Sequence, residues 1–369
     1  MKSCVIAFLI VFTGFVPPVF SATADKMFYR LVTTTNTAII GLAGGNHLVW
    51  SNAVPYGRFK IEATSELGNS STGLWAVVVD GDVTNLNMAE QVPITESPFP
   101  PNNSMILVPE GVFLMGDNSD GNRGDYPEHL IWVRACYMDK TEVSKGLWDD
   151  VVSWAATNGY VFDETAVGTD TNFPVAGVSW YDCIKWCNAR SEKEGYAPVY
   201  FTDDTKTVIY KVGTLDLGKA HVAWDHIGYR LPTEAEWEKS ARGGLVQNYY
   251  PWPSPGPTND SAYLDATNAN YSGTGTTAVA SFPANGYGLY DMAGNVSEWC
   301  WDWWDRYNSF IDPTGPTNST SRATRGGDFI NGSVAYGDGY NLRCSARERA
   351  ERPSFTDSSL GFRCVRSCP

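Results

Sequence analysis

Histidine is scarce in this sequence of 369 residues, which contains only His47, His129, His221 and His226. None of them forms an H-x-x-x-H or H-E-x-x-H pair, the spacings that place two imidazoles on one metal ion. A zinc or iron centre built on several histidines would need nearly all four, from distant places in the sequence. The scarcity therefore argues against a multi-histidine metal centre.

Basic residues and long apolar runs are also few. Lys and Arg number 27 against 41 Asp and Glu, and the formal net charge is −14. An acidic protein repels the phosphate backbone, so we expect no nucleic-acid partner. Beyond residue 24, no stretch approaches the roughly 20 apolar residues that a membrane-spanning helix needs. We therefore do not expect an integral membrane protein.

The one strongly apolar run lies at the N-terminus. Lys2 precedes the apolar residues 4–16, and Ala22-Thr23-Ala24 follows as an A-x-A-like cleavage site. The run has about thirteen residues, shorter than a typical membrane span. We expect residues 1–24 to be a signal peptide and the mature protein to be exported, to the periplasm or outside the cell. An uncleaved membrane anchor is the alternative.

Cysteine is present in an odd number once this segment is removed. Cys4 lies within it, and the other seven are Cys136, Cys183, Cys187, Cys300, Cys344, Cys364 and Cys368. Export permits disulfides. The odd number leaves at least one thiol free or paired outside the chain.

The remaining sequence predicts two domains. Residues 25–96 contain four β-rich runs separated by glycine-rich turns: AIIGL (38–42), HLVW (47–50), RFKIEA (58–63) and LWAVVVD (74–80). Such runs are typical of a small all-β domain, a sandwich or half-barrel. Residues 97–104 contain three prolines and predict a linker. The second domain covers residues 105–369.

Helices are predicted at three places in the second domain. They are residues 145–157 after Ser144, residues 180–194 after Ser179, and a helix after Thr233, where Thr233 and Glu236 form a capping box and Gly243-Gly244 ends the helix. Almost everything else is rich in Gly, Asn, Asp and Trp and lacks regular periodicity. The domain is therefore expected to be rich in loops.

An ordered series of motifs carries a family resemblance. The motifs are MILVPEGVFLMGD (105–117), DYPEHLIWVRACYMDKTEVS (125–144), FPVAGVSWYDCIKWCN (173–188), YRLPTEAEWEKSARGG (229–244), FPANGYGLYDMAGNVSEWCWDWW (282–304), TRGGDF (324–329) and LGFRC (360–364). In this order they resemble the formylglycine-generating enzyme, or sulfatase-modifying factor, family over about residues 105–366. The resemblance implies a loop-rich α+β fold of the C-type-lectin-like kind, here preceded by the small all-β domain.

The resemblance also identifies what is missing. In the oxidases of this family, two cysteines between a Gly-Gly-Ser motif and an Arg-Cys-Ala-Ala-Arg segment bind Cu(I), which prefers soft thiolate ligands. Here RGGDF (325–329) and RCSAR (343–347) match the two anchors, and Cys344 takes the place of a structural cysteine. No cysteine lies between Gly327 and Arg343. We therefore expect no copper site in this segment and name no catalytic residue.

The polar and aromatic residues that remain favour binding, because such side chains suit adaptable hydrogen bonding. We predict a non-catalytic module for an exported protein, peptide or glycan ligand. The alternatives are a formylglycine-generating or related oxidative maturation enzyme acting on exported proteins, and a purely structural role. The candidate ligand-binding residues are Asp328, Asn331, Ser333, Tyr336, Asp338, Tyr340, Trp304 and Tyr307. Strand alternation instead predicts that Trp299, Trp301 and Trp303 are buried on one face.

Calcium is the cofactor that the resemblance implies. Asp291 and Glu298 would supply carboxylate oxygens, and Gly294 and Val296 backbone carbonyls, the ligands that this hard cation prefers. A turn with solvated acids is the alternative. A weaker second site would begin at Asn270 and Tyr271.

Disulfides are the interpretation that export favours for Cys183 and Cys187, which lie one turn apart on a helix. A dithiol metal or redox site is the alternative. By resemblance, Cys187 pairs with Cys364. The family's partner of Cys344 falls at Ala241 in this chain, so we predict that Cys344 pairs with Cys183 instead. Cys136, Cys300 and Cys368 have no predicted partner.

Overall fold

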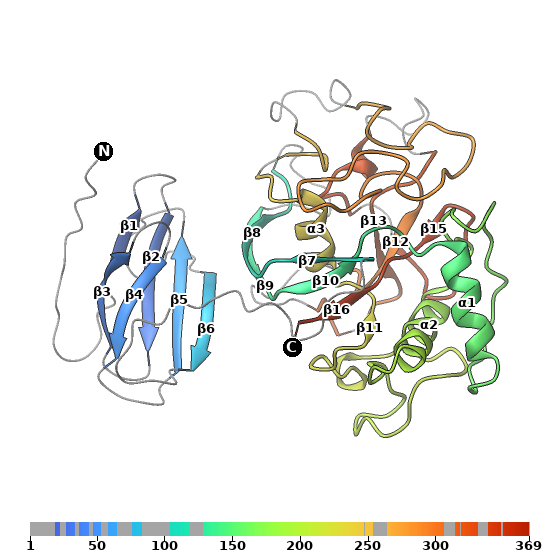
Figure 1. Ribbon diagram of the computed structural model, residues 1–369, viewed down its shortest axis with the longest axis horizontal. Coiled ribbons are helices and arrows are strands. Elements are labelled where there is room, and N and C mark those ends of the chain that lie inside the picture. The colour runs from blue at the N-terminus through green and yellow to red at the C-terminus, as the bar shows by residue number, and fades with distance from the viewer. Residues whose placement is uncertain are drawn as a thin grey trace. The chain divides into compact units, whose positions relative to one another are not determined.

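The chain divides into two compact units, residues 1–98 and residues 99–369 (Figure 1). The division falls within the predicted linker, 97–104. The computed structural model describes six strands of the first unit as backbone. In the second unit it describes residues 104–118, 128–246, 248–253, 264–305, 314–317, 319–330, 339–347 and 350–368.

The first unit is built of β-strands. Strands β1 (Val19–Ala22), β2 (Met27–Thr33), β5 (Arg58–Thr64) and β6 (Ala76–Asp82) form an antiparallel sheet in that order, and β3 (Thr37–Ala43) pairs with β4 (His47–Asn52). The four predicted runs correspond to β3, β4, β5 and β6, whereas β1 and β2 were not predicted. Strand β1 lies inside the predicted signal peptide.

The second unit contains two four-stranded sheets and a hairpin. The strands are β7 (Met105–Val108), β8 (Gly111–Met115), β9 (His129–Val133), β10 (Cys136–Asp139), β11 (Tyr229–Arg230), β12 (Ser297–Trp303), β13 (Arg322–Arg325), β14 (Ala350–Glu351), β15 (Leu360–Gly361) and β16 (Val365–Ser367). The sheet orders are β11-β16-β10-β7 and β14-β13-β12-β15, and β8 pairs with β9.

All three predicted helices are confirmed, because their caps are local. They are α1 (Lys145–Ala155), α2 (Trp180–Lys193) and α3 (Glu234–Arg242), with two 3₁₀ turns at Lys219–His221 and Tyr340–Leu342. Ser144 and Ser179 each accept a backbone N–H three residues later, and Thr233 and Glu236 form the capping box. Gly243 ends α3 in the left-handed conformation, at φ 57°. No helix of the described residues is long and apolar enough to cross a membrane.

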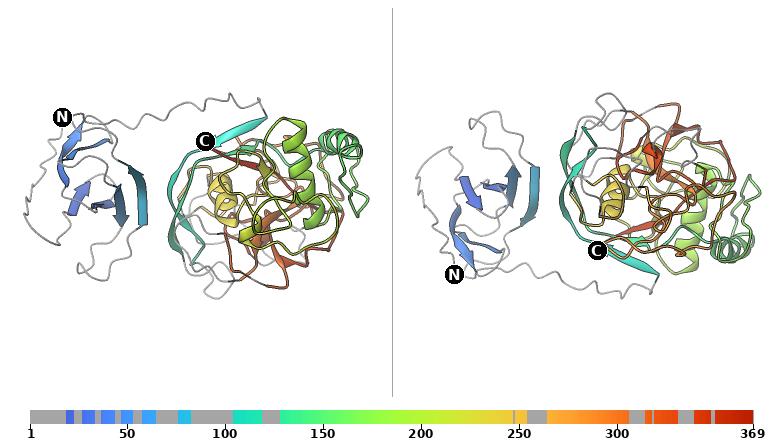
Figure 2. Two further views of the ribbon diagram at one scale, coloured as in Figure 1. Left: turned by 90° about the horizontal axis from the view of Figure 1, so that it is seen from below. Right: turned by 90° about the horizontal axis from the view of Figure 1, so that it is seen from above.

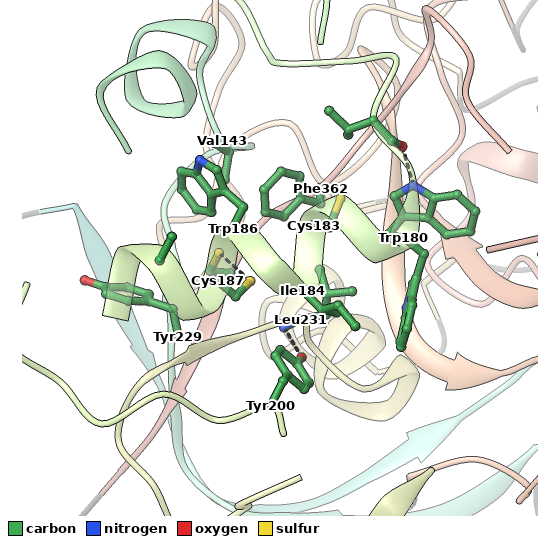
Figure 3. Close-up of a cluster of buried hydrophobic side chains, with 14 of the residues drawn as sticks. Val143, Trp180, Cys183, Ile184, Trp186, Cys187, Tyr200, Tyr229, Leu231 and Phe362 are labelled. Carbon is green, nitrogen blue, oxygen red and sulfur yellow. Dashed lines mark hydrogen bonds between the residues drawn. The ribbon is translucent and has the colours of Figure 1, made fainter. Parts of the chain in front are cut away.

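The core lies on both sides of β12. Figures 1 and 2 show α1 and α2 together on one side of the strands β12, β13 and β15, and α3 on the other. The α2 side is aromatic (Figure 3): the rings of Trp148 and Trp186 stack with centroids 5.7 Å apart, and the Trp180 and Trp301 centroids are 5.5 Å apart.

Strand β12 corrects one expectation about the tryptophans. Trp299, Trp301 and Trp303 are buried as predicted, but all seven residues of the strand are buried. The reason is that the second face is covered by α3, whose Trp237 donates its Nε1–H to Glu298 over 2.7 Å. A central strand covered on both faces has no solvent side.

Candidate functional site

Residues 326–344 resemble the family's catalytic region and are called the segment below. Two glycines open it. Gly326 and Gly327, directly after β13, have φ values of 93° and 66°. This left-handed backbone favours glycine. A Cβ on Gly326 would also lie 3.1 Å from the ring of Trp237. The Gly-Gly pair is therefore needed for the chain to turn away from α3.

Asp328 and Tyr340 are buried, with 1% and 3% of their surfaces exposed, which corrects the expectation that both lie on a binding surface. The Asp328 carboxylate accepts the backbone N–H of Ile330 over 2.9 Å and the hydroxyl of Ser359 over 3.0 Å. The Tyr340 ring packs 4.9 Å from the Arg343 guanidinium. Each side chain holds an end of the segment in place, so neither is presented to solvent.

Buried ion pairs fix both ends of this segment to α3 and its surroundings. Before it, Arg325 donates to Glu238 over 2.7 Å; after it, Arg347 makes a bidentate pair with Glu234 at 2.9 and 2.8 Å. Arg343 pairs with Asp117 at 3.2 Å. Removing one partner of a buried pair leaves the other charge buried without a counter-ion, which is costly. These contacts therefore constrain the ends strongly.

Cys344 lies at the far end of the segment and is fully buried. Burial raises the pKa of its thiol to about 12, against the lowering effect of Arg242. Its backbone N–H donates to the carbonyl of Tyr249 over 2.6 Å. Since the thiolate is the form that attacks or binds metals, burial and the raised pKa disfavour reaction of this thiol at neutral pH.

Asp291 provides a buried oxygen with no partner. Its Oδ2 accepts the N–H of Ala280 over 2.7 Å, while Oδ1 is buried without a hydrogen bond. Burial, with a smaller contribution from nearby Glu298, raises the pKa of Asp291 to about 6, against the lowering effects of the Ala280 N–H and Arg363. Gly294 follows with φ 77°, and a Cβ there would come within 2.2 Å of the carbonyl oxygen of Asn270. The loop therefore needs its glycine.

Glu298 is already fully engaged. Arg363 donates to both of its oxygens at distances from 2.7 to 3.0 Å, and Trp237 donates to Oε2. A third buried acid, Glu142, accepts from the backbone of Val296 over 3.1 Å and from the amide of Asn295 over 2.8 Å.

The pKa of Glu142 is raised well above its usual range by burial, then by Asp291 and Glu298. Three buried carboxylates thus surround the single guanidinium of Arg363. Sequence reasoning missed Glu142 because it lies some 150 residues from the loop it contacts. Its place in the KTEVS motif carries no signal of that contact.

A family model described as the sulfatase-modifying factor enzyme 1-like domain matches residues 91–368. The chain belongs to this family. The formylglycine-generating enzyme of Bos taurus is 33% identical over 303 residues, which are 73% of this chain and 75% of that protein.

Two further relatives carry other names. The serine/threonine-protein kinase pkn1 of Chlamydia caviae is 30% identical over 314 residues, 83% of this chain and 45% of that protein. Among solved structures, Treponema denticola variable protein 1 has a TM-score of 0.56 and 28% identity, over 72% of this chain and 95% of that one. The expected C-type-lectin-like α+β fold is confirmed by such neighbours.

The calcium site that the family implies is matched in part by the residues present. Asp291 offers its unpartnered Oδ1, and Gly294 and Val296 lie in the same tight loop. Glu298 would have to release a hydrogen bond from Arg363 or Trp237 to bind a cation. Within the described ranges, no three His, Cys, Asp or Glu side chains are grouped to hold a metal. A cation here would therefore depend on Asp291 and backbone carbonyls.

The weaker second site, predicted at Asn270 and Tyr271, lies against the loop that contains Asn295. Asn270 donates its amide to the carbonyl of Gly275 over 3.0 Å, and its own carbonyl accepts the N–H of Asn295 over 2.7 Å. Tyr271 is half-buried against the cluster around Tyr250. These contacts brace the loop of Asp291 and Gly294 from outside.

The cysteines after residue 24 are all thiols in this structure. Cys187 and Cys364 lie with their Sγ atoms 3.6 Å apart, so the structure brings this predicted pair together (Figure 3). Cys183 lies in the same aromatic cluster as these two, whereas Cys344 packs in a second cluster with Ala241 and Trp237. The structure therefore does not bring Cys183 and Cys344 together, because β12 separates the two clusters.

The remaining candidates are placed as follows. Trp304 is half-buried, and its Nε1–H donates to the carbonyl of Arg347 over 2.8 Å, which ties it to the end of the segment. Asn331, Ser333, Tyr336, Asp338 and Tyr307 lie outside the described residues.

Proposed function

We propose that this protein is an exported, non-catalytic ligand-binding member of the family. The observation that carries the proposal is the absence of cysteine between Gly327 and Arg343. A Cu(I) site in that segment needs two thiolates. Cys344 supplies none, because it is buried and its pKa is raised to about 12. The ligand would be an exported protein, a peptide or a glycan.

The ion pairs at both ends support this proposal. Arg325, Arg343 and Arg347 hold the ends of the segment through buried carboxylates. A base fixed in this way can carry a segment that meets a ligand. Binding sites are commonly loops positioned by a rigid scaffold.

The alternative is formylglycine generation or a related oxidative maturation of exported proteins. The 33% identity to the bovine protein of that name favours it. Other relatives are named a protein kinase and a variable protein, so the domain occurs in proteins of different names. Because the cysteine pair is missing, the alternative needs a different reactive centre.

Calcium and a disulfide would brace the binding module. Asp291 and the carbonyls of Gly294 and Val296 would hold the cation, whose two positive charges offset the excess of buried carboxylates. The pair Cys187–Cys364 would be oxidised after export, since its sulfur atoms already lie 3.6 Å apart. Both additions would stabilise a domain with few helices.

The decisive experiment combines an activity test with a binding test. The purified protein is incubated with a Cys-x-Pro-x-Arg peptide, Cu(I) and oxygen, and the peptide mass is followed. We expect no change, and a mass loss at the peptide cysteine would refute the proposal.

Glycan and peptide arrays then test binding. A variant with residues 331–338 replaced by Gly and Ser should lose the signal while its melting temperature is retained.

A further inference from the structure

Lys185 on α2 is a buried amine placed between two carboxylates. Its side chain is 0% exposed, and its Nζ lies 2.6 Å from Oδ2 of Asp163 and 2.9 Å from Oδ1 of Asp182. The side chain of Asp182 is also 0% exposed, while that of Asp163 is 39% exposed. A buried lysine is uncommon, and its charge is costly to desolvate.

Asp182 aligns the other two groups. It lies in the first turn of α2, and its carboxylate accepts the backbone N–H of Asp163 and of Glu164, each over 3.0 Å. The ring of Phe162 covers the amine, with its centroid 6.0 Å from Nζ. The Asp163 carboxyl is thus held against Nζ through both its main chain and its side chain. The fixed contact between Nζ and the Asp163 carboxyl replaces a bimolecular encounter. The effective concentration of each group toward the other is therefore high.

We propose that Lys185 and Asp163 condense into an intramolecular amide, a crosslink that is independent of the ligand-binding proposal. The Lys185 ammonium passes a proton to Asp182, which frees the nitrogen lone pair to attack Cγ of Asp163. The N–C bond forms, and one Asp163 oxygen leaves as water after taking up the two protons of the ammonium that the amide does not keep. The ammonium and carboxylate become an amide and water, and Asp182 ends as a carboxylate.

The environment favours this condensation over a lasting ion pair. The amide is neutral, so the reaction removes two charges from a partly water-excluded place, where keeping them is costly. The exposed part of Asp163 gives the released water a path to solvent. The product closes a covalent loop between residues 163 and 185, and such closure restricts the unfolded chain as a disulfide does.

The chain contains a matched control at its surface. Lys145 and Asp149 on α1 are also 2.6 Å apart, but their side chains are 21% and 54% exposed. Water solvates both charges there, and no third carboxylate of the described contacts aligns them. We expect this pair to remain an ion pair.

Mass spectrometry of the full mature protein tests the proposal directly. After reduction of disulfides, the wild type should be lighter by one water than its sequence mass, whereas Lys185→Arg and Asp163→Ala should have their full masses. Asp182→Asn should keep most of the protein at full mass. Trypsin should fail to cut after Lys185 and cut normally after Lys145, which leaves residues 146–190, with both Asp163 and Lys185, as one peptide lighter by one water. A second cut after Glu164, between the two residues, should leave the two halves joined.

Two results would overturn the crosslink. One is a wild-type protein of full mass that trypsin cleaves after Lys185. The other is loss of water that stays on one of the two halves when the chain is cut after Glu164, because that result indicates a cyclised aspartate instead of a link between two residues. Because the first measurement is made on the wild type, it stands even where a variant does not fold.

Discussion

The two sides of β12 are built on different interactions. On the α2 side, Trp299 and Trp301 meet stacked aromatic rings and buried thiols. On the α3 side, Glu298 and Asp302 meet Trp237, Arg363 and the N-terminus of α3. The alternation of one strand thus separates an apolar half from a charged half. The apolar half provides stability by burial, while the charged half fixes directions, because ion pairs and hydrogen bonds are directional.

The largest effect is expected on the aromatic side. Trp301 is 2% exposed and contacts Trp180, Tyr200 and Trp224. Trp301→Ala should lower the free energy of unfolding by about 3–5 kcal/mol, through lost burial and the cavity left behind. Urea denaturation measures it. The half-exposed Trp252→Ala is the control, and equal losses in the two variants would contradict a core organised around β12.

A smaller effect is expected on the charged side. Arg347→Lys keeps the charge but loses the bidentate pair with Glu234 and the bond to the carbonyl of Asp305. Because lysine cannot reproduce the planar fork, we expect a loss of roughly 1–3 kcal/mol. Lys193→Arg, at a surface pair, should change nothing measurable. Ligand binding that survives Arg347→Lys at full affinity would show that the segment does not need this anchor.

The smallest effect on stability is expected from calcium binding at Asp291. Burial raises the pKa of Asp291 to about 6, so the folded protein without calcium binds more protons than the unfolded chain, whose Asp pKa is about 3.9. Its stability should therefore fall as the pH rises from 4 to 6. Because a calcium ion would bind the ionised carboxylate, we expect added calcium to raise the melting temperature by a few degrees at pH 7 and less at pH 4.

Two variants check the calcium prediction. Asp291→Asn should remove most of the calcium response, while Asp265→Asn, at an exposed turn, should keep it. A melting temperature that calcium leaves unchanged in the wild type would refute the site. If Glu298→Gln alone abolished the response, Glu298 and not Asp291 would be the main side-chain ligand.

The fold was predictable to a considerable extent, and the site only partly. The caps at Ser144, Ser179 and Thr233 bond within three residues, so the sequence around each helix start is enough to predict them. The pairing of Cys183 with Cys344 was not local. It rested on Ala241 replacing the family's cysteine, whereas Ala241 and Cys344 lie in one cluster and Cys183 in the other. The burial of Asp328 depends likewise on Ser359, some thirty residues away.

The sequence by itself determined the helices, the family and the lack of thiols between Gly327 and Arg343. Caps act within one turn, motifs identify a family, and no fold can supply a side chain that the segment does not contain. Only the tertiary structure decided that Glu298 is held by Arg363, that Glu142 contacts the loop at Asn295 and Val296, and that Lys185 lies between Asp163 and Asp182. These outcomes depend on which distant segments pack together, and burial there sets the cost of each charge.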